Sequence, residues 1–271
     1  MISQAQRHRF CSWLIDRART RGHELTDADL RLPALVVAPH PDDEALACGG
    51  TILRKTQLGA RVRLLFMTDG SRSHPGLIEP DRLREIRRGE ALAAAALMGV
   101  AANDVVFLDF DDAHLAAQRS AATERVREII RATSPTQVFA PYARDINPDH
   151  VATNRIVHAA LRGCRPRPRL YEYTVYLWGR WPWSGKAGVS GRAYRLWIHA
   201  LPGMIRCAAF AVRFRDFVGV ESVLDRKRDA LAAHRSQMSP IAPGAWTIPK
   251  VSGGELVQWH FCGSEFFRAR Q

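Results

Sequence analysis

Residues 34–50 read ALVVAPHPDDEALACGG, and the interpretation of the whole chain starts from this stretch. Its first five residues form a short apolar run rich in valine, which is typical of a buried parallel strand. A polar turn follows at once, and Pro41 suits the first position of a helix, where its missing N–H costs nothing. We therefore expect the polar residues at the carboxyl end of a strand, where open α/β sheets bind ligands.

The turn at residues 40–44 carries three carboxylates and one imidazole. His40 and Asp43 can face one point as nitrogen and oxygen ligands of a metal ion. Asp42 lies between them and is free to act on a water at the metal. An acidic first turn that only complements the helix dipole is the alternative, but it leaves the histidine directly before Pro41 unexplained. The pattern therefore favours a metal site.

Strand and helix patterns alternate through the first part of the chain, after an amphipathic helix at residues 3–21 and a connector at 24–32. Strands that alternate with helices of this length imply right-handed βαβ units and a parallel sheet. Two glycines inside the first of these helices indicate close approach of the helix to a strand or a ligand. The predicted strands are 34–38, 61–68, 104–110 and 137–140, and the predicted helices are 45–58, 81–98, 121–132 and 147–161.

The pattern changes at residue 169, so we divide the chain into a Rossmann-like catalytic core, residues 1–168, and a smaller β-rich part, 169–271, that completes the sheet and the substrate cleft. The fold class is α/β, with a mostly parallel sheet flanked by helices. Basic and aromatic residues mix at 179–217, which fits either a membrane surface or a β-rich subdomain with solvated charges. The other predicted segments are a strand at 170–178, a helix at 222–235, a loop at 239–254 and a closing segment at 256–267.

The bulk properties narrow the class of protein. The net charge of +12 favours an anionic partner, such as nucleic acid, a membrane face or a phosphorylated substrate. A GC-rich genome that encodes arginine where others encode lysine explains the charge nearly as well. Five cysteines are scattered without a CxxC pair, which indicates reduced thiols and a cytosolic setting. The first 22 residues lack the apolar core of a signal peptide, and no run of about 18 apolar residues occurs. We expect a cytoplasmic protein, with contact at the inner membrane face left open.

A second motif, Asn147-Pro148-Asp149-His150, echoes the first and directly follows the fourth predicted strand. Neighbouring strand ends in a parallel sheet could bring His150 beside His40 and Asp43. Two histidines and a carboxylate with an open fourth position are what a catalytic zinc site needs. Taken alone, His150 would be a surface helix residue and Asn147 a helix N-cap, but the paired motifs favour the metal site.

At these motifs the chain resembles the PIG-L/LmbE-like family of metal-dependent de-N-acetylases. The resemblance rests on PHPDDEALACGG at the first strand end and on PDH at residues 148–150. Further matches are Arg87 and Glu90 in RRGEALAAAALMGV, Asp112 after the third strand, LYEY from Leu170, and KRDALAAHRSQ at residues 227–237. The matches extend from about residue 34 to residue 237.

The resemblance implies zinc ligands at His40, Asp43 and His150, with Fe²⁺ or another divalent ion as a substitute, and a general base at Asp42. It implies removal of acetyl groups from N-acetylglucosamine-type sugars on varied aglycones, lipid-linked or anionic ones included. The family usually reads His-Pro-Asp-His at the second motif, whereas this chain has Asn147. An amide can donate a hydrogen bond to an oxyanion but cannot supply a proton.

We therefore expect Asp42 to take the proton of the attacking water and then to protonate the leaving amine, with Asn147 helping to stabilise the oxyanion. His74 is a more distant candidate for the proton donor. Three further residues, Arg72, Arg87 and Asp112, are expected to contact substrate hydroxyls or a phosphate, against surface charge or turn formation as the alternatives. Asp149 is expected to orient a ligand histidine, although it also suits the first turn of a helix.

Two other classes of protein are less consistent with these motifs. A dinucleotide-binding enzyme shares the alternation, but no GxGxxG follows the first strand, and the acidic residues there would repel a pyrophosphate. A non-enzymatic basic protein that binds nucleic acid or a membrane surface explains the charge but leaves HPDDE without a role. We therefore expect an N-acetylated amino-sugar conjugate as the partner and no nucleic acid.

Overall fold

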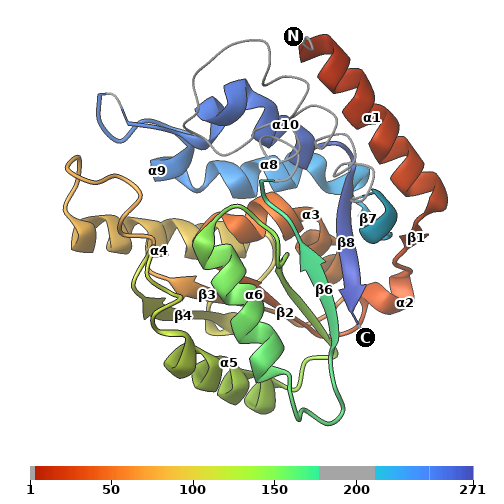
Figure 1. Cartoon of the computed structure of the whole chain (residues 1–271), viewed down its shortest axis with the longest axis horizontal. Coiled ribbons are helices and arrows are strands. Elements are labelled where there is room, and N and C mark those ends of the chain that lie inside the picture. The colour runs from red at the N-terminus through yellow and green to blue at the C-terminus, as the bar shows by residue number, and fades with distance from the viewer. Residues whose placement is uncertain (1–3, 177–210, 244, 271) are drawn as a thin grey trace, which may run out of the picture.

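One mixed sheet forms the centre of the structure, a computed structural model that describes residues 4–176, 211–243 and 245–270 (Figure 1). Its strands are β1 (His23–Glu24), β2 (Ala34–Ala38), β3 (Val62–Thr68), β4 (Val105–Phe110), β5 (Gln137–Pro141), β6 (Arg169–Tyr173), β7 (Asp216–Gly219) and β8 (Ser264–Arg270). The α-helices of the same residues are α1 (Gln4–Arg21), α2 (Asp27–Leu30), α3 (Asp43–Gln57), α4 (Pro80–Leu97), α5 (Arg119–Thr133), α6 (Pro148–Ala160), α8 (Leu224–Ala232), α9 (Arg235–Met238) and α10 (Glu255–His260).

The strand order is β1-β7-β8-β6-β5-β2-β3-β4. Neighbouring strands from β6 to β4 are parallel, and so are β1 and β7, whereas β8 runs antiparallel to both β6 and β7. The predicted α/β fold with a mostly parallel sheet is therefore confirmed, and the antiparallel pairing lies among the C-terminal strands. The division at residue 168 stays a prediction, and the sheet is continuous across it, because β6 pairs directly with β5.

Helices cover both faces of the sheet (Figure 1). Alternate β2 side chains point to opposite faces, so that Val36 packs in a core with residues of α3, α4 and α8, whereas Val37 packs in a second core with residues of α5 and α6. Every residue of β2 is buried for this reason. The two-sided burial explains why this strand reads as a continuous apolar run rather than as an alternating one.

The strand order reverses at β2, and this reversal determines where a ligand can bind. The chain proceeds from β2 to β3 and β4 on one side and then returns to place β5 on the other side of β2. Other doubly wound sheets bind their ligands at such a switch point, which here lies between the carboxyl ends of β2 and β5. Both sequence motifs lie at this point, because His40 follows β2 and His150 lies in α6, after β5.

Several predicted boundaries differ from the observed ones for identifiable reasons. The strand predicted at 170–178 ends at Tyr173, where its parallel partner β5 ends at Pro141. The helix predicted at 222–235 is broken, with α8 ending at Ala232 and α9 beginning at Arg235. Most of the basic, aromatic segment 179–217 lies outside the described residues, so neither the membrane contact nor the β-rich subdomain considered for it is tested. Within the described part of the chain, no helix is long and apolar enough to cross a bilayer.

The close approach predicted from the glycines of α3 is observed, and the partner is the C-terminal part of the chain. A Cβ atom on Gly50 would lie 2.5 Å from Val220 Cγ1. At the same place, Glu265 of β8 accepts hydrogen bonds from the Gly50 and Thr51 backbone N–H groups, both at 2.7 Å. Lys227 of α8 donates to the same carboxylate at 2.7 Å. The C-terminal elements are thus fixed on the helix that begins at the HPDDE motif.

His260 is part of this buried contact and predicts how stability depends on pH. Its backbone carbonyl accepts from Lys227, and its Nε2 lies 2.7 Å from the Val175 carbonyl oxygen. Burial and the neighbouring Lys227 ammonium lower the pKa of His260 to about 4. The unfolded chain takes up this proton near pH 6.5 and the folded chain does not, so His260 destabilises the fold as the pH falls from about 6.5 to 4.

We expect this effect to be about 2 kcal/mol at pH 5. In His260→Gln the amide can still donate to the Val175 carbonyl but cannot titrate. Urea unfolding of both proteins at pH 7 and pH 5 measures the effect, and the wild type should lose about 2 kcal/mol more than the variant between these values. Equal losses in the two proteins would show that protonation of His260 makes no contribution to the pH dependence of stability.

Candidate metal and catalytic site

One carboxylate oxygen joins the two sequence motifs. Asp43 Oδ2 lies 3.1 Å from His40 Nδ1 and 3.2 Å from His150 Nε2, and it also accepts the His40 backbone N–H at 3.0 Å. Asp43 and His150 are buried, and His40 is half-buried. One ligand atom from each of the three residues lies within 4.8 Å of the others. The structure therefore brings together the three residues that the sequence predicted to meet.

The His/Asp/His group fits a metal ion by its own chemistry. His150 Nε2 is buried and has no hydrogen-bond partner among the described residues, although Asp43 is close by. A core histidine normally has both ring nitrogens satisfied, whereas a free imidazole nitrogen that faces a carboxylate is the arrangement of a zinc ligand. Two nitrogens and one oxygen also leave room for a further ligand.

Carboxylates on the opposite ring nitrogens orient both imidazoles. His150 Nδ1 lies 3.2 Å from Asp145 Oδ2, and His40 Nε2 lies 3.4 Å from both Asp112 Oδ1 and Asp149 Oδ2. Such partners fix the ring orientation and the tautomer of a metal-binding histidine. His40, Asp112 and Asp149 also form a second three-residue group with metal-ligating atoms within 4.8 Å of one another. Asp145 was not predicted from the sequence, where its only signal is a carboxylate five residues before His150.

The carboxylates control the charge of the site. Burial lowers the pKa of His150, but Asp43 and Asp145 outweigh it and raise this pKa to about 9. Burial likewise lowers the pKa of His40, and its bonds to Asp112, Asp149 and Asp43 raise it well above the usual value. The two imidazoles in turn keep the pKa of Asp43 low in spite of its burial. A metal ion must therefore displace protons from both histidines when it binds.

Asp42 occupies the N-cap position of α3 in a strained conformation. Its φ of 140° lies in the region that side-chain-bearing residues rarely adopt. The side chain makes no capping hydrogen bond, and its carboxylate lies 3.6 Å from Arg87 Nη2. Burial and the Asp43 charge raise the pKa of Asp42 to about 7, although Arg87 acts in the opposite direction. A carboxylate of this kind suits a general base near neutral pH.

Arg87 lies behind this turn rather than on the surface. It is 2% exposed, and its guanidinium donates to the Gly70 carbonyl at 2.7 Å and to the Pro41 carbonyl at 2.8 Å. The motifs predicted a substrate contact for Arg87. Its hydrogen bonds are instead made to the loops that follow β2 and β3.

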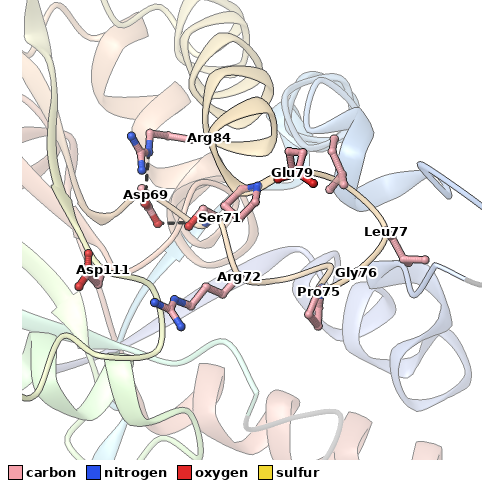
Figure 2. A pocket seen from close by; sticks show the side chains of 11 residues that line it. Asp69, Ser71, Arg72, Pro75, Gly76, Leu77, Glu79, Arg84 and Asp111 are labelled. Atoms are coloured by element: carbon pink, nitrogen blue, oxygen red, sulfur yellow. Dashed lines mark hydrogen bonds and ion pairs between the residues drawn. The ribbon is translucent and has the colours of Figure 1, made fainter.

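Arg72 is one of the residues that line a cavity of about 760 Å³ (Figure 2). Its backbone N–H donates to Asp112 Oδ2 at 2.9 Å, while its guanidinium makes no hydrogen bond or ion pair with the residues that the structure describes. Figure 2 shows Arg72 and Asp111 on the same side of this cavity. The loop at 75–80 also lines this cavity. Arg72 is therefore free to meet a ligand.

Asn147 and His74 have different surroundings from those expected. Asn147 Oδ1 caps α6 by accepting the Asp149 backbone N–H at 2.8 Å, which leaves the amide nitrogen of Asn147 as its donor group. The side chain also hydrogen-bonds Tyr176, whose ring centroid lies 5.4 Å from that of His150. His74 is buried against Trp246, and its ring nitrogens contact Ser73 Oγ and the Trp246 carbonyl. Both ring nitrogens of His74 are thus engaged within its own loop and with Trp246, and its role as a proton donor stays a prediction.

Comparison with known proteins agrees with the candidate metal and catalytic residues described above. The family model "PIG-L: GlcNAc-PI de-N-acetylase" matches residues 35–161, a range that contains His40, Asp42, Asp43 and His150. A probable N-acetyl-alpha-D-glucosaminyl L-malate deacetylase 2 of Bacillus cereus is 27% identical over 231 residues, which cover 83% of this chain and 92% of the relative. A 1D-myo-inositol 2-acetamido-2-deoxy-alpha-D-glucopyranoside deacetylase of Rhodococcus opacus is 28% identical over 267 residues, with 84% and 89% covered.

The fold is also found in a solved structure. The N,N'-diacetylchitobiose deacetylase of Pyrococcus horikoshii superposes with a TM-score of 0.63 at 20% identity, covering 88% of this chain and 83% of that one. The fold and the site thus define an α/β protein with a candidate metal group at the switch point of its sheet. The chain belongs to the PIG-L/LmbE-like family of de-N-acetylases, which confirms the resemblance seen in its motifs.

Removal of one imidazole tests the metal group. His150→Ala should lower zinc affinity at least about tenfold, because it deletes one of three protein ligands. His158→Ala is a matched control, since His158 lies on the same helix and pairs with the Glu172 carboxylate at 3.2 Å, away from the group. Competition with a coloured chelator measures both affinities. Zinc affinity that is unchanged in His150→Ala would remove His150 from the ligand set.

Proposed function

We propose that this protein is a zinc-dependent deacetylase that hydrolyses the acetamide of an N-acetylglucosamine-type conjugate. The observation that carries the proposal is the convergence of His40, Asp43 and His150 at the sheet's switch point, with Asp42 beside them. The Bacillus and Rhodococcus relatives are described as deacetylases of N-acetylglucosaminyl conjugates of malate and of inositol, which supports this substrate class. The compartment that we propose is the cytoplasm.

In this proposal His40, Asp43 and His150 hold the zinc ion, and Fe²⁺ or another divalent ion would suit the same donor set. When bound, the ion would supply Lewis acidity, which polarises the acetyl carbonyl and lowers the pKa of a water to about 7. Asp145 and Asp149 orient the two imidazoles from their opposite ring nitrogens. Asp112 also contacts His40 Nε2, and so connects this metal ligand to the part of the site that would bind the substrate.

Asp42 moves the protons in this proposal. Its carboxylate accepts one proton from the water as the water oxygen bonds to the acetyl carbon. The same carboxyl group then gives the proton to the sugar nitrogen as the C–N bond breaks, so that acetate and a free amine leave. The raised pKa of Asp42, about 7, suits both directions of transfer. A single group acts twice, because Asn147 cannot supply a proton.

Asn147 and Arg72 contact the substrate. The Asn147 amide, whose oxygen caps α6, donates a hydrogen bond to the oxygen on which negative charge develops. Arg72, with its free guanidinium, binds a hydroxyl or an anionic group of the conjugate in the adjoining cavity. Asp112 accepts from a sugar hydroxyl there or keeps Arg72 in place through the bond to its backbone N–H. Arg87 does not contact the substrate in this proposal. It supports the turn that carries the base, through its hydrogen bond to the Pro41 carbonyl and its ion pair with Asp42.

Acetate release from a panel of conjugates tests the proposal, with N-acetylglucosaminyl malate, N-acetylglucosaminyl inositol and diacetylchitobiose as substrates. Activity should disappear on metal removal and return with added zinc. Asp42→Asn should keep the zinc and lose at least about 100-fold in kcat, the usual value of general-base catalysis. Asp225→Asn, an exposed carboxylate on α8, should leave kcat unchanged. Loss of zinc in Asp42→Asn would make Asp42 a ligand instead.

Asn147 can be tested without losing its helix cap. Asn147→Asp keeps an oxygen for the Asp149 N–H but has no amide to donate, so kcat should fall about 100-fold while the unfolding midpoint changes little. Asn147→His restores a donor and should keep most of the activity. Steady-state kinetics and thermal unfolding of both variants provide the comparison. An Asn147→Asp enzyme that works at the wild-type rate would leave Asn147 with capping alone.

A further inference from the structure

The peptide group between Pro41 and Asp42 is held at both ends by side chains. The Pro41 carbonyl accepts from Arg87 Nη2 at 2.8 Å and from Gln237 Nε2 at 2.6 Å. The Asp42 N–H donates to Glu44 Oε2 at 2.9 Å. Arg87 belongs to α4, Gln237 to α9 and Glu44 to α3. Side chains from three helices thus fix the orientation of this peptide group, which directly precedes the Cα atom of Asp42.

The Glu44 carboxylate extends this arrangement to the C-terminal part of the chain. Its second oxygen, Oε1, lies 2.8 Å from His234 Nε2, and both side chains are completely buried. His234 directly precedes α9, and Gln237 lies within it. The motif KRDALAAHRSQ at residues 227–237 therefore brings two separate side chains to the turn that carries Asp42. Neither His234 nor Gln237 belongs to the His/Asp groups of the site.

The conformation of Asp42 requires such support. A residue with a side chain at φ of 140° is strained and persists only where its surroundings fix it. No capping bond from the Asp42 side chain contributes here. The hydrogen bonds to the Pro41 carbonyl and the Asp42 N–H are consequently what keeps the peptide from rotating to a relaxed φ. Such a rotation would turn the Asp42 carboxylate away from Asp43 and its partners.

We propose that His234 and Gln237 are positioning residues, which act through the Pro41–Asp42 peptide to aim the Asp42 carboxylate at the reacting water. This inference rests on the proposed function, since Asp42 is the base in that reaction. Misplacement of a catalytic group by about 1 Å can lower a rate about 100-fold while leaving substrate contacts intact. Loss of either residue should therefore lower kcat, with KM and zinc content close to those of the wild type.

The decisive variant is Gln237→Met, which keeps the volume of the side chain and removes the donor to Pro41. Ser236→Ala is its matched control. Ser236 is the preceding residue of α9, is equally buried, and bonds through its hydroxyl to Glu90 Oε2 of α4 at 2.6 Å, away from the peptide. Each variant thus deletes one buried hydrogen bond between α9 and the core. Both should show a similar small loss of thermal stability.

We expect kcat to fall at least about tenfold in Gln237→Met and to stay within about twofold of the wild type in Ser236→Ala. His234→Gln keeps a donor for Glu44 and should retain more activity than His234→Leu. If Gln237→Met and Ser236→Ala have the same kcat, or if Gln237→Met loses its zinc, the positioning role is wrong.

A crystal structure of Gln237→Met separates this inference from the proposed function. The positioning role requires that the φ of Asp42 moves out of the positive region, whatever the enzyme's substrate is. An Asp42 φ that stays near 140° in the variant would overturn the inference even if the wild type is an active deacetylase. A wild type that releases acetate from no conjugate, with a relaxed Asp42 in the variant, would overturn the proposed function alone.

Discussion

The arrangement of the site depends on one buried oxygen, Asp43 Oδ2, which lies between the imidazoles of His40 and His150. A carboxylate without such partners would be costly to bury, and the low pKa of Asp43 reflects the two imidazoles that compensate it. The contact joins the turn after β2 to α6, which follows β5, and so connects the two halves of the chain at the switch point of the sheet. A divalent ion at the same place would replace the displaced protons and keep the two halves together.

The C-terminal elements support this site rather than forming part of it. Glu265 and Lys227 fix β8 and α8 on the N-terminal half of α3, and Gln237 reaches the turn just before that helix. The helix that carries Asp43 is therefore fixed from two directions. The close contact with the C-terminal elements explains why α3 has a glycine, Gly50, in its interior, since a larger residue would collide with Val220. The constraints on the catalytic turn thus come from residues almost 200 positions away in the sequence.

The sequence predicted the features that depend on local chemistry. Apolar runs that end at a Pro-containing turn located β2, β5 and the ligand candidates His40, Asp43 and His150, because strand ends and helix starts have local signals. The position of Arg87 could not be predicted in this way. Its burial results from the Gly70 and Pro41 carbonyls, which only the folded sheet brings within reach. The strained φ of Asp42 was hidden for the same reason, since the side chains that fix it come from distant helices.

Crystals grown with zinc would test the central claim most directly, through anomalous diffraction recorded at the zinc absorption edge. The account predicts one strong anomalous peak at bonding distance from His40, Asp43 and His150, about 2.0 to 2.2 Å from each ligand atom. The second group, formed by His40, Asp112 and Asp149, offers a clear alternative position on the other side of the same imidazole. A peak at that second group alone, with none beside His150, would contradict the account.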